Sequence, residues 1–594
     1  MNNTTDKKPL GFGKTMLASA TGFIAAFLVI HTLGFFLMIG LVAALISSSS
    51  TTTTLVTGDH LFVNIDLSRT IYERTPDKMT ALLNESKGAG MGDLLKAIAK
   101  AKEDKRVEGI LLSCDGASMD WAQCEELREA LADYHTTSGK PVVAYADNYS
   151  QSAYYLASQC DQVALHPSGL VDLRGIGAQV IFYKDLLDKL GVKVDLIRPR
   201  SNAYKSAGET YIRNNMSEAN REQVRAYIES IWGHVSQKMA ESRGMEVAQL
   251  NHMADDLTGY IASDAQKSNL VDTLLFKRDI NNLLKEKYGC KRVVDAVKYA
   301  HSFTDSKQED KIAVVYAEGT VQDGTSEGYK TAVYGDDIAE ALYQAAQDDD
   351  VKAIVLRINS PGGSATASES MTHAVIEARK IKPVVVSMSG VAASAGYEIA
   401  SNATTIVAQP TTITGSIGVF AAIPEVGSLL QKKLGIGIDT VSTNRNSNGL
   451  TIVRPLSPTA QSVMQRHVEE FYQLFCQRVA EGRGMTPEAV DVIGRGRVWT
   501  GLQARENGLV DTLGGMNLAL RIAAEKAGIG SYSTVEYPKE KDLMNRLLQL
   551  ADEKEDIVLN DRLGSFAPYY RELMQWCTMA PVQARLPYIL QIER

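Results

Sequence analysis

One serine turn and one lysine are the residues of this sequence best suited to catalysis. Ser394 lies in Ala392-Ala-Ser-Ala-Gly-Tyr397, directly after a strand-like apolar run. A nucleophilic serine on a tight turn needs small neighbours, and the N–H group of the next residue can stabilise an oxyanion. Taken alone, Ser394 is equally consistent with a helix cap. Lys205 also lies among small residues, in Ala203-Tyr-Lys-Ser-Ala-Gly-Glu209, although most lysines are simply surface residues.

Two glycine-rich turns accompany this serine. Asn359-Ser-Pro-Gly-Gly-Ser364 follows a predicted strand and precedes a predicted helix. A turn of this kind directs N–H groups outward and suits an anion or oxyanion, but most such turns are only turns. No Gly-Lys-Ser/Thr follows it, which excludes a phosphate loop. Ser416, in Thr414-Gly-Ser-Ile-Gly418, is by itself an ordinary turn hydroxyl.

The chain contains an internal duplication. Val107-Glu-Gly-Ile-Leu-Leu-Ser113 matches Val351-Lys-Ala-Ile-Val-Leu-Arg357, at an offset of 351 − 107 = 244 positions. Ser217 to Met245 matches Ser457 to Met485 without a gap, at an offset of 457 − 217 = 240 positions. Ordered similarity at a constant offset indicates two copies of one unit.

Each copy alternates strand-like and helical segments. In the second copy we predict strands at Ile312–Tyr316, Ala353–Ile358, Val384–Met388 and Thr405–Val407, and helices at Asp337–Gln347, Ala365–Arg379 and Ser457–Gly482. Buried apolar strands that alternate with amphipathic helices are typical of an α/β domain with a mainly parallel sheet.

The N-terminal region contains a candidate membrane anchor. The 31 residues from Met16 to Ile46 include no Asp, Glu, Lys or Arg, whereas a spanning helix needs about 20 apolar residues. Lysines precede this run, so the positive-inside rule leaves the N-terminus in the cytoplasm of a single-pass inner-membrane protein and places the catalytic region in the periplasm. The predicted segments are a cytoplasmic N-terminus (1–15), a transmembrane anchor (16–46), a linker (47–57), an N-terminal repeat (58–300), a C-terminal repeat (301–535) and a C-terminal extension (536–594).

Composition excludes several other classes of protein. The chain has 594 residues, of which 45% are hydrophobic and 22% charged, so it is not disordered as a whole. Its net charge of 62 − 70 = −8 argues against nucleic-acid binding. The six cysteines show no zinc-site spacing, and Cys114 and Cys124 allow a bridge that we do not predict. We expect no metal and no organic cofactor.

These motifs together closely resemble those of the signal peptide peptidase A family, in its long, duplicated form also called protease IV. The resemblance extends from the anchor to about Gly515. It implies tandem Clp-protease/crotonase-like domains and a serine protease with a Ser–Lys dyad. It assigns the nucleophile to Ser394, the general base to Lys205, the lysine-orienting hydroxyl to Ser416, and the oxyanion hole to the N–H groups of Gly363 and Ala395. Many members have Gly-Gly after the nucleophile, whereas this chain has Ala395-Gly396; only the N–H group is needed there.

The resemblance also implies a biological role. It predicts hydrophobic peptide substrates, above all signal peptides left in the membrane, and a homotetramer. The alternative is a catalytically silent scaffold of the same fold that binds hydrophobic peptides at the membrane. A crotonase-like acyl-CoA enzyme is a distant third, because coenzyme A is absent across the membrane.

The predicted site combines both repeats. Lys205 belongs to the first repeat and Ser394 to the second, and the sequence leaves open whether they meet within one chain or between chains. The ungapped register places Gln151 opposite Ser394, and a shift of one residue places Ser152 there. The first repeat therefore keeps the lysine but not the serine turn, and the second repeat keeps the turn but no matching lysine.

Overall fold

The structure is a computed structural model that describes residues 40, 56–75, 88–303, 308–326, 332–538 and 583–585. The predicted anchor, apart from residue 40, and most of the predicted C-terminal extension lie outside the described residues. Within the described part of the chain, no helix combines the length and the apolar composition that a bilayer crossing requires. The chain divides into residues Met1–Thr57 and a compact unit, Gly58–Arg594, which contains both repeats.

The first repeat is built on a six-stranded parallel sheet in the order β8-β6-β5-β4-β1-β9. Its strands are β1 (Leu61–Asp66), β4 (Val107–Ser113), β5 (Val142–Tyr149), β6 (Gln162–Val171), β8 (Thr273–Leu274) and β9 (Arg292–Asp295), with the short strands β2 (Ile71–Tyr72), β3 (Ala89–Gly90) and β7 (Lys193–Ile197) outside this sheet. Its helices are α3 (Met91–Glu103), α4 (Trp121–Ser138), α5 (Gln151–Ala157), α6 (Lys184–Leu190), α7 (Glu209–Ile212), α8 (Glu218–Arg243), α9 (Val247–Asp255), α10 (Ala262–Lys267), α11 (Ile280–Tyr288) and α12 (Ala296–His301).

The second repeat has the same strand order, since β21-β10-β13-β15-β16-β20 corresponds to β9-β1-β4-β5-β6-β8. Its main sheet contains β10 (Lys311–Glu318), β13 (Val351–Ser360), β15 (Val384–Ala393), β16 (Thr405–Ala408), β17 (Ile413–Gly415), β19 (Val498–Thr500), β20 (Thr512–Leu513) and β21 (Ser533–Tyr537). Its helices are α13 (Gly335–Gln347), α14 (Ala365–Ile381), α15 (Ala395–Ser401), α16 (Pro458–Arg483), α17 (Pro487–Ile493), α18 (Gly501–Glu506) and α19 (Met516–Ala527). The duplication inferred from sequence is therefore present in the topology.

A small second sheet lies beside the glycine turn of the second repeat. Its order is β12-β11-β14-β22, formed by β11 (Thr320–Gln322), β12 (Ala332–Tyr334), β14 (Gly362–Ser364) and β22 (Gln583–Arg585). The last of these strands comes from the predicted C-terminal extension. The predicted boundary at residue 535 falls inside β21, which continues to Tyr537 in the main sheet.

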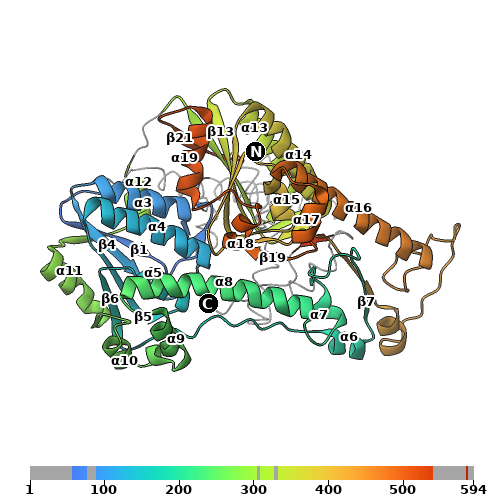
Figure 1. Cartoon of the computed structure of the whole chain (residues 1–594), viewed down its shortest axis with the longest axis horizontal. Coiled ribbons are helices and arrows are strands. Elements are labelled where there is room, and N and C mark those ends of the chain that lie inside the picture. Colours follow the sequence, from blue (N-terminus) through green and yellow to red (C-terminus); the bar gives the residue numbers. More distant parts are fainter. Residues whose placement is uncertain are drawn as a thin grey trace, which may run out of the picture. The chain divides into compact units, whose positions relative to one another are not determined.

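The predicted elements of the second repeat form for the reasons that their sequences indicate. β13 is buried along almost its whole length, because helices cover both faces of its sheet (Figure 1). On α13, Ile338, Leu342 and Ala345 share one face and enter the core, and Ser364 caps α14 through the Ala367 N–H group. The long helix α16 buries Val468, Tyr472 and Phe475 among others in the same core.

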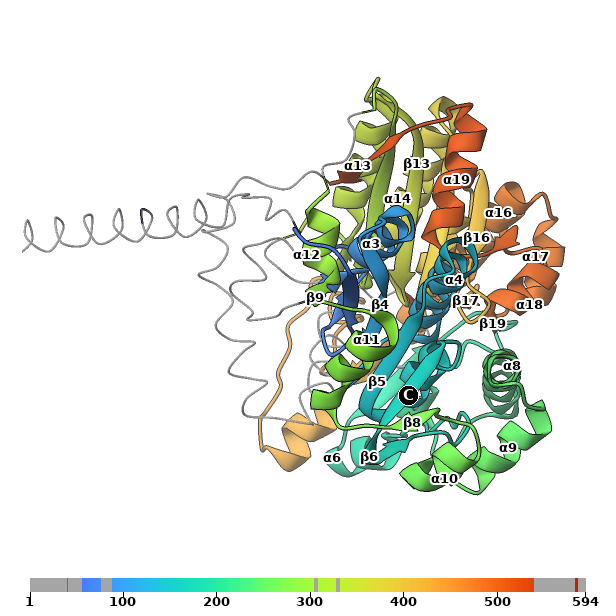
Figure 2. The same cartoon turned by 90° about the vertical axis from the view of Figure 1, so that its left-hand side faces the viewer.

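The two repeats are joined by more than one kind of contact. β7 of the first repeat pairs antiparallel with β18 (Ala421–Glu425) of the second. Helix α8 packs against β19, and these elements lie side by side in both views (Figures 1 and 2). Cys114 and Cys124 are both free thiols, so the bridge that their spacing allows does not form.

A buried ion-pair cluster also joins the repeats. Arg357 of β13 binds Glu73 and Glu126 of the first repeat, at 2.7 and 2.6 Å, and all three side chains are at most 3% exposed. Ser389 and Gln123 also donate hydrogen bonds to Glu73. Burial alone would raise the pKa of Glu73, but Arg357 and these donors hold it below its ordinary value.

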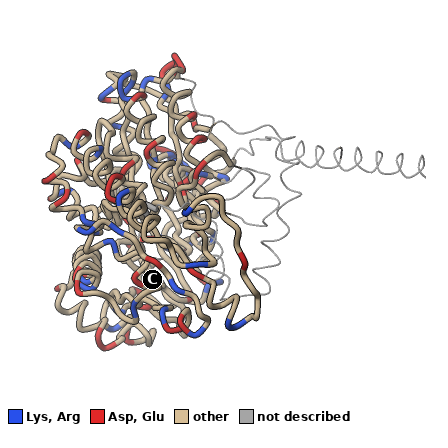
Figure 3. The backbone as a smooth tube through the Cα atoms, turned by 90° about the vertical axis from the view of Figure 1, so that its right-hand side faces the viewer, with Lys and Arg blue, Asp and Glu red and all other residues tan. Residues whose placement is uncertain are grey.

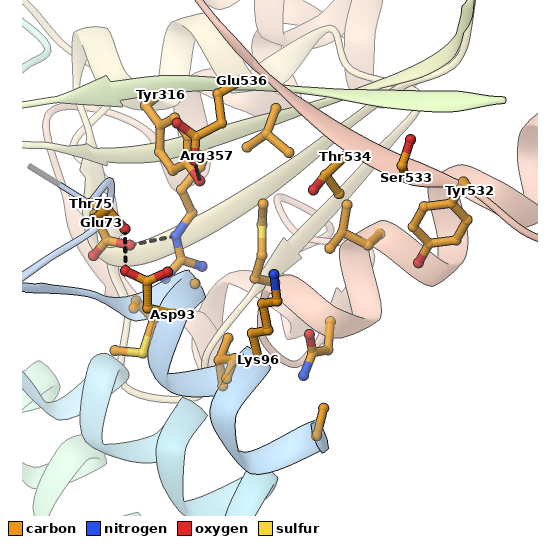
Figure 4. A pocket seen from close by; sticks show the side chains of 18 of the residues that line it. Glu73, Thr75, Asp93, Lys96, Tyr316, Arg357, Tyr532, Ser533, Thr534 and Glu536 are labelled. Carbon is orange, nitrogen blue, oxygen red and sulfur yellow. Dashed lines mark hydrogen bonds and ion pairs between the residues drawn. The ribbon is translucent and has the colours of Figure 1, made fainter. Parts of the chain in front are cut away.

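The Glu73–Arg357 pair borders a cavity of about 520 Å³ between the repeats (Figure 4). Thr75 and Asp93 lie on one side of this cavity, and Tyr316 and Glu536 on another. Neither Lys205 nor Ser394 lines it. Along the rest of the described chain, acidic and basic residues are interspersed, which agrees with the modest net charge (Figure 3).

Loss of the central arginine is expected to destabilise the fold. Arg357→Met leaves two buried carboxylates without their partner, so we expect the free energy of unfolding to fall by about 3–5 kcal/mol. The control is Arg466→Met, because Arg466 is 73% exposed and lies 3.8 Å from Glu470; this change is expected to cost less than about 1 kcal/mol. Urea unfolding measures both. Equal losses would contradict a structural role for the cluster.

Candidate active site

Lys205 and Ser394 meet within one chain at the boundary between the repeats. The Nζ atom of Lys205 lies 2.8 Å from the Oγ atom of Ser394, and both side chains are completely buried. Lys205 lies in the loop between β7 and α7, and Ser394 lies between β15 and α15. The structure therefore answers the question that the sequence left open, since the lysine of the first repeat reaches the serine of the second in the same molecule.

Ser416 provides the other two hydrogen-bond contacts of the Lys205 amine. Nζ of Lys205 lies 2.9 Å from the carbonyl oxygen of Ser416 and 3.0 Å from its Oγ atom. Ser416 is itself fixed by its own N–H group, which donates to the carbonyl oxygen of Arg497. A neutral amine has two N–H donors and one lone pair. In this geometry, Ser416 can accept the donors while the lone pair faces the hydroxyl of Ser394.

Ser394 adopts a strained backbone conformation. Its φ and ψ angles are 56° and −119°, a region that residues other than glycine rarely occupy. The Ser394 N–H group donates to the carbonyl oxygen of Gly415, which fixes the turn at the end of β15. Small neighbours are necessary here, because a Cβ atom on Gly396 would lie only 2.8 Å from the carbonyl oxygen of Ser360.

The two predicted oxyanion donors flank this turn. Ala395 is the first residue of α15, directly after Ser394. Gly363 lies in β14, and a Cβ atom there would be 2.1 Å from the carbonyl oxygen of Val321. Gly362 has a φ of 97°, which favours glycine. The turn brings β14 near Ser394, because Ser360 pairs with Ala392 of β15.

Burial changes the protonation of the groups around the serine. It lowers the pKa of Lys205 well below its ordinary value of 10.5, and the charge of Glu398 opposes part of this shift. Burial also raises the pKa of Glu398 to about 8, against the hydrogen bond from Ser368. Glu398 lies on α15 one turn after Ser394. The environment therefore favours a neutral amine, which can accept a proton.

Two residues outside the loop that carries Lys205 hold this loop in place. A Cβ atom on Gly496 would lie 2.4 Å from the Lys205 backbone, and Gly496 has a φ of 80°. Gln223 of α8 donates to the carbonyl oxygen of Tyr204 and accepts from the Val498 N–H group. Sequence reasoning did not single out Gly496 or Gln223. The glycine-containing segment Gly494-Arg-Gly-Arg497 indicates a turn at Gly496, but nothing in the sequence places this turn against Lys205.

The duplication explains why the first repeat has no second dyad. The two short helices align through equivalent contacts, since the Tyr154 hydroxyl donates to the carbonyl oxygen of Leu270 and the Tyr397 hydroxyl donates to that of Leu509. This offset of 397 − 154 = 243 positions places Gln151 opposite Ser394, as the ungapped sequence register predicts, and it places Ser150, the N-cap of α5, one position earlier. Ser150 has an ordinary extended backbone, and its hydroxyl caps the Ala153 N–H group. At the position of the predicted nucleophile this repeat has a glutamine, whose side-chain oxygen accepts hydrogen bonds from the N–H groups of Arg174 and Gly175.

Comparison with known proteins agrees with this fold and defines a peptidase with Clp-protease-like domains. The family model of peptidase family S49 matches residues 135–291 and 376–530, once in each repeat, and the Clp protease model matches residues 308–412. The chain belongs to peptidase family S49 and is a serine protease.

Three relatives match most of this chain. The chain is 37% identical to "Protease 4" of Salmonella typhi over 82% of this chain and 79% of that protein. It is 34% identical to "Protease 4" of Haemophilus influenzae, over 83% of each chain. It is 29% identical to the chloroplast "Serine protease SPPA" of Arabidopsis thaliana, over 78% of this chain and 69% of that protein. The resemblance to the signal peptide peptidase A family is therefore confirmed.

Crowding the lysine loop is expected to impair hydrolysis. Gly496→Ala places a methyl group against the Lys205 backbone, and a displacement of about 1 Å in a catalytic group can reduce kcat/KM about 100-fold. Gly528→Ala is the control, because Gly528 also has a positive φ, of 68°, but no atom lies within 4 Å of its Cβ position. Peptide hydrolysis below the melting temperature measures both variants. Equal activities would contradict the role of Gly496.

Proposed function

We propose that this protein is a membrane-anchored serine endopeptidase in which Ser394 is the nucleophile and Lys205 the general base. The observation that carries this proposal is the 2.8 Å contact between Nζ of the buried lysine and Oγ of the buried serine. An amine with a lowered pKa within hydrogen-bond reach of a hydroxyl is the arrangement that nucleophilic catalysis requires.

The mechanism follows from the contacts of the two side chains. Neutral Lys205 accepts the hydroxyl proton as Ser394 Oγ attacks the peptide carbonyl carbon. The N–H groups of Gly363 and Ala395 stabilise the oxyanion of the tetrahedral intermediate. The lysine then donates its proton to the leaving amine, and water hydrolyses the acyl-enzyme through the same base. Ser416 keeps the amine oriented through both steps, as the third residue of a triad does.

The substrates in this proposal are cleaved signal peptides and other hydrophobic peptides. The catalytic unit is periplasmic, held to the inner membrane by residues 16–46 and the short linker that follows, with the N-terminus in the cytoplasm. The apolar, uncharged composition of residues 16–46 supports an anchor. The names of the relatives support a peptidase of this type. The Clp-protease-like fold supports a homo-oligomer, which we propose to be a tetramer.

Removal of either dyad side chain is expected to abolish hydrolysis. Ser394→Ala removes the attacking oxygen and Lys205→Ala removes the base, so each is expected to reduce kcat at least 100-fold while the melting temperature changes little. Mixing and co-refolding the two inactive variants is expected to restore nothing, because the dyad forms within one chain. Retained activity in Ser394→Ala would contradict the assignment of the nucleophile. Peptide binding without hydrolysis by the unmodified protein would favour the silent scaffold.

The pH dependence is expected to report on Lys205. Only the neutral amine accepts the serine proton, so kcat/KM is expected to rise with pH through an apparent pKa well below 10.5. Glu398 carries its negative charge, which favours the ammonium form, only as the pH approaches its raised pKa of about 8. Glu398→Gln is therefore expected to move to lower pH the part of the limb above about pH 7, and to leave the part below it in place. Glu470→Gln, which changes a residue that is 65% exposed, is the control. A limb that moves to higher pH in Glu398→Gln would contradict this electrostatic account.

Substrate preference is expected to favour apolar or small residues before the cleaved bond, because an enzyme tethered to the bilayer meets hydrophobic fragments. Kinetics on paired peptide libraries, matched in length and different only in charge, measure this preference. Faster cleavage after charged residues would exclude hydrophobic peptides as the preferred class, without affecting the dyad assignment.

A further inference from the structure

A short strand from the C-terminal region lies along the glycine turn beside the dyad. β22 pairs antiparallel with β14, with Arg585 opposite Gly362, Ala584 opposite Gly363 and Gln583 opposite Ser364. β11 pairs with the other side of β14, through Val321 and Gly363. The backbone of the glycine turn is therefore paired on both sides, and its outer neighbour comes from 584 − 363 = 221 positions later in the chain.

The direction of β22 matters for the chemistry. The N-terminal end of β14 is the end nearest Ser394, because Ser360 pairs with Ala392 and lies against Gly396. The other end of β14, Ser364, leads into α14. Since the pairing is antiparallel, β22 runs from Ser364 toward Gly362. Arg585, the last residue of β22, is thus the residue of this strand nearest Ser394. A substrate bound in the same direction would bring the carbonyl group at the end of its strand toward Ser394 Oγ.

The dyad is closed in this structure. Ser394 and Lys205 have no exposed surface, and Gly362 and Gly363 are buried. A peptide substrate must nevertheless bring a carbonyl carbon to Ser394 Oγ. Extended peptides commonly bind by adding a strand to a sheet edge, where main-chain hydrogen bonds provide affinity. The edge of β14 is the one beside the dyad, and β22 occupies it.

We propose that β22 is an intramolecular occupant of the substrate-strand position on β14, and that it excludes added peptides until it leaves. This inference rests on the proposed function because it takes an extended peptide as the ligand. A tethered segment competes at an effective concentration of about 1 mM. If β22 itself binds this edge with an intrinsic Kd of about 0.1 mM, it weakens the binding of an added peptide about tenfold. The ligand class is any extended peptide whose backbone can pair with Gly362–Ser364.

The test compares three chains that all carry Ser394→Ala, so that neither the tail nor an added peptide is cut. One is full length, one ends at residue 586 and keeps β22, and one ends at residue 582 and lacks it. Hydrogen exchange of Gly362–Ser364 and the Kd of a fluorescent apolar peptide are measured on each. We expect only the chain ending at 582 to exchange faster at these amides and to bind the peptide about tenfold more tightly.

A fourth variant tests the contact without shortening the chain. Ala584→Pro, in the Ser394→Ala background, removes the N–H group at the centre of β22 and is expected to behave like the chain ending at 582. Equal exchange and equal affinity in all variants would overturn the inference, as would a full effect in the chain that ends at 586. The proposed function is tested separately, because it fails if the unmodified protein hydrolyses no peptide or if Ser394→Ala retains activity, and neither result bears on β22.

Discussion

The proposed chemistry of this protein depends on keeping one primary amine out of water at the boundary between two repeats. Lys205 has no exposed surface, and its nearest polar atoms belong to Ser394 and Ser416 of the other repeat. Desolvation disfavours the ammonium form, so packing between the repeats favours the neutral amine that the proposed mechanism requires. Contacts between the repeats therefore support the proposed chemistry without touching a substrate. They include the packing of Gly496 against the lysine loop and the ion pairs of Arg357 with two carboxylates.

The residues of the candidate site come from two copies of one fold. At the junction of a central strand and a short helix, the second copy has Ser394 in a strained turn, whereas the first copy has Gln151 at the matching position, after the helix-capping Ser150. Only the second copy follows its neighbouring strand with a Gly-Gly turn, and only the first contributes a lysine. Each copy alone has an incomplete site, so neither repeat is expected to be a protease by itself.

Much of this organisation could be predicted from sequence because it depends on patterns among neighbouring residues. Apolar runs of strand length predicted β10, β13, β15 and β16, and small residues around Ser394 marked a tight turn. The approach of Gly496 to Lys205 and the pairing of β22 with β14 could not be predicted, since both join positions more than 200 residues apart and depend on tertiary packing. The predicted anchor lies almost wholly outside the described residues, so it stays a prediction.

The most direct test of the central claim is covalent labelling with a serine-directed fluorophosphonate, mapped by mass spectrometry. If Lys205 activates Ser394 within one chain, the unmodified protein carries the adduct on Ser394, and Lys205→Ala loses it at neutral pH although Ser394 is still present. An adduct on a different serine, or labelling of Ser394 at the same rate in Lys205→Ala, would contradict the account.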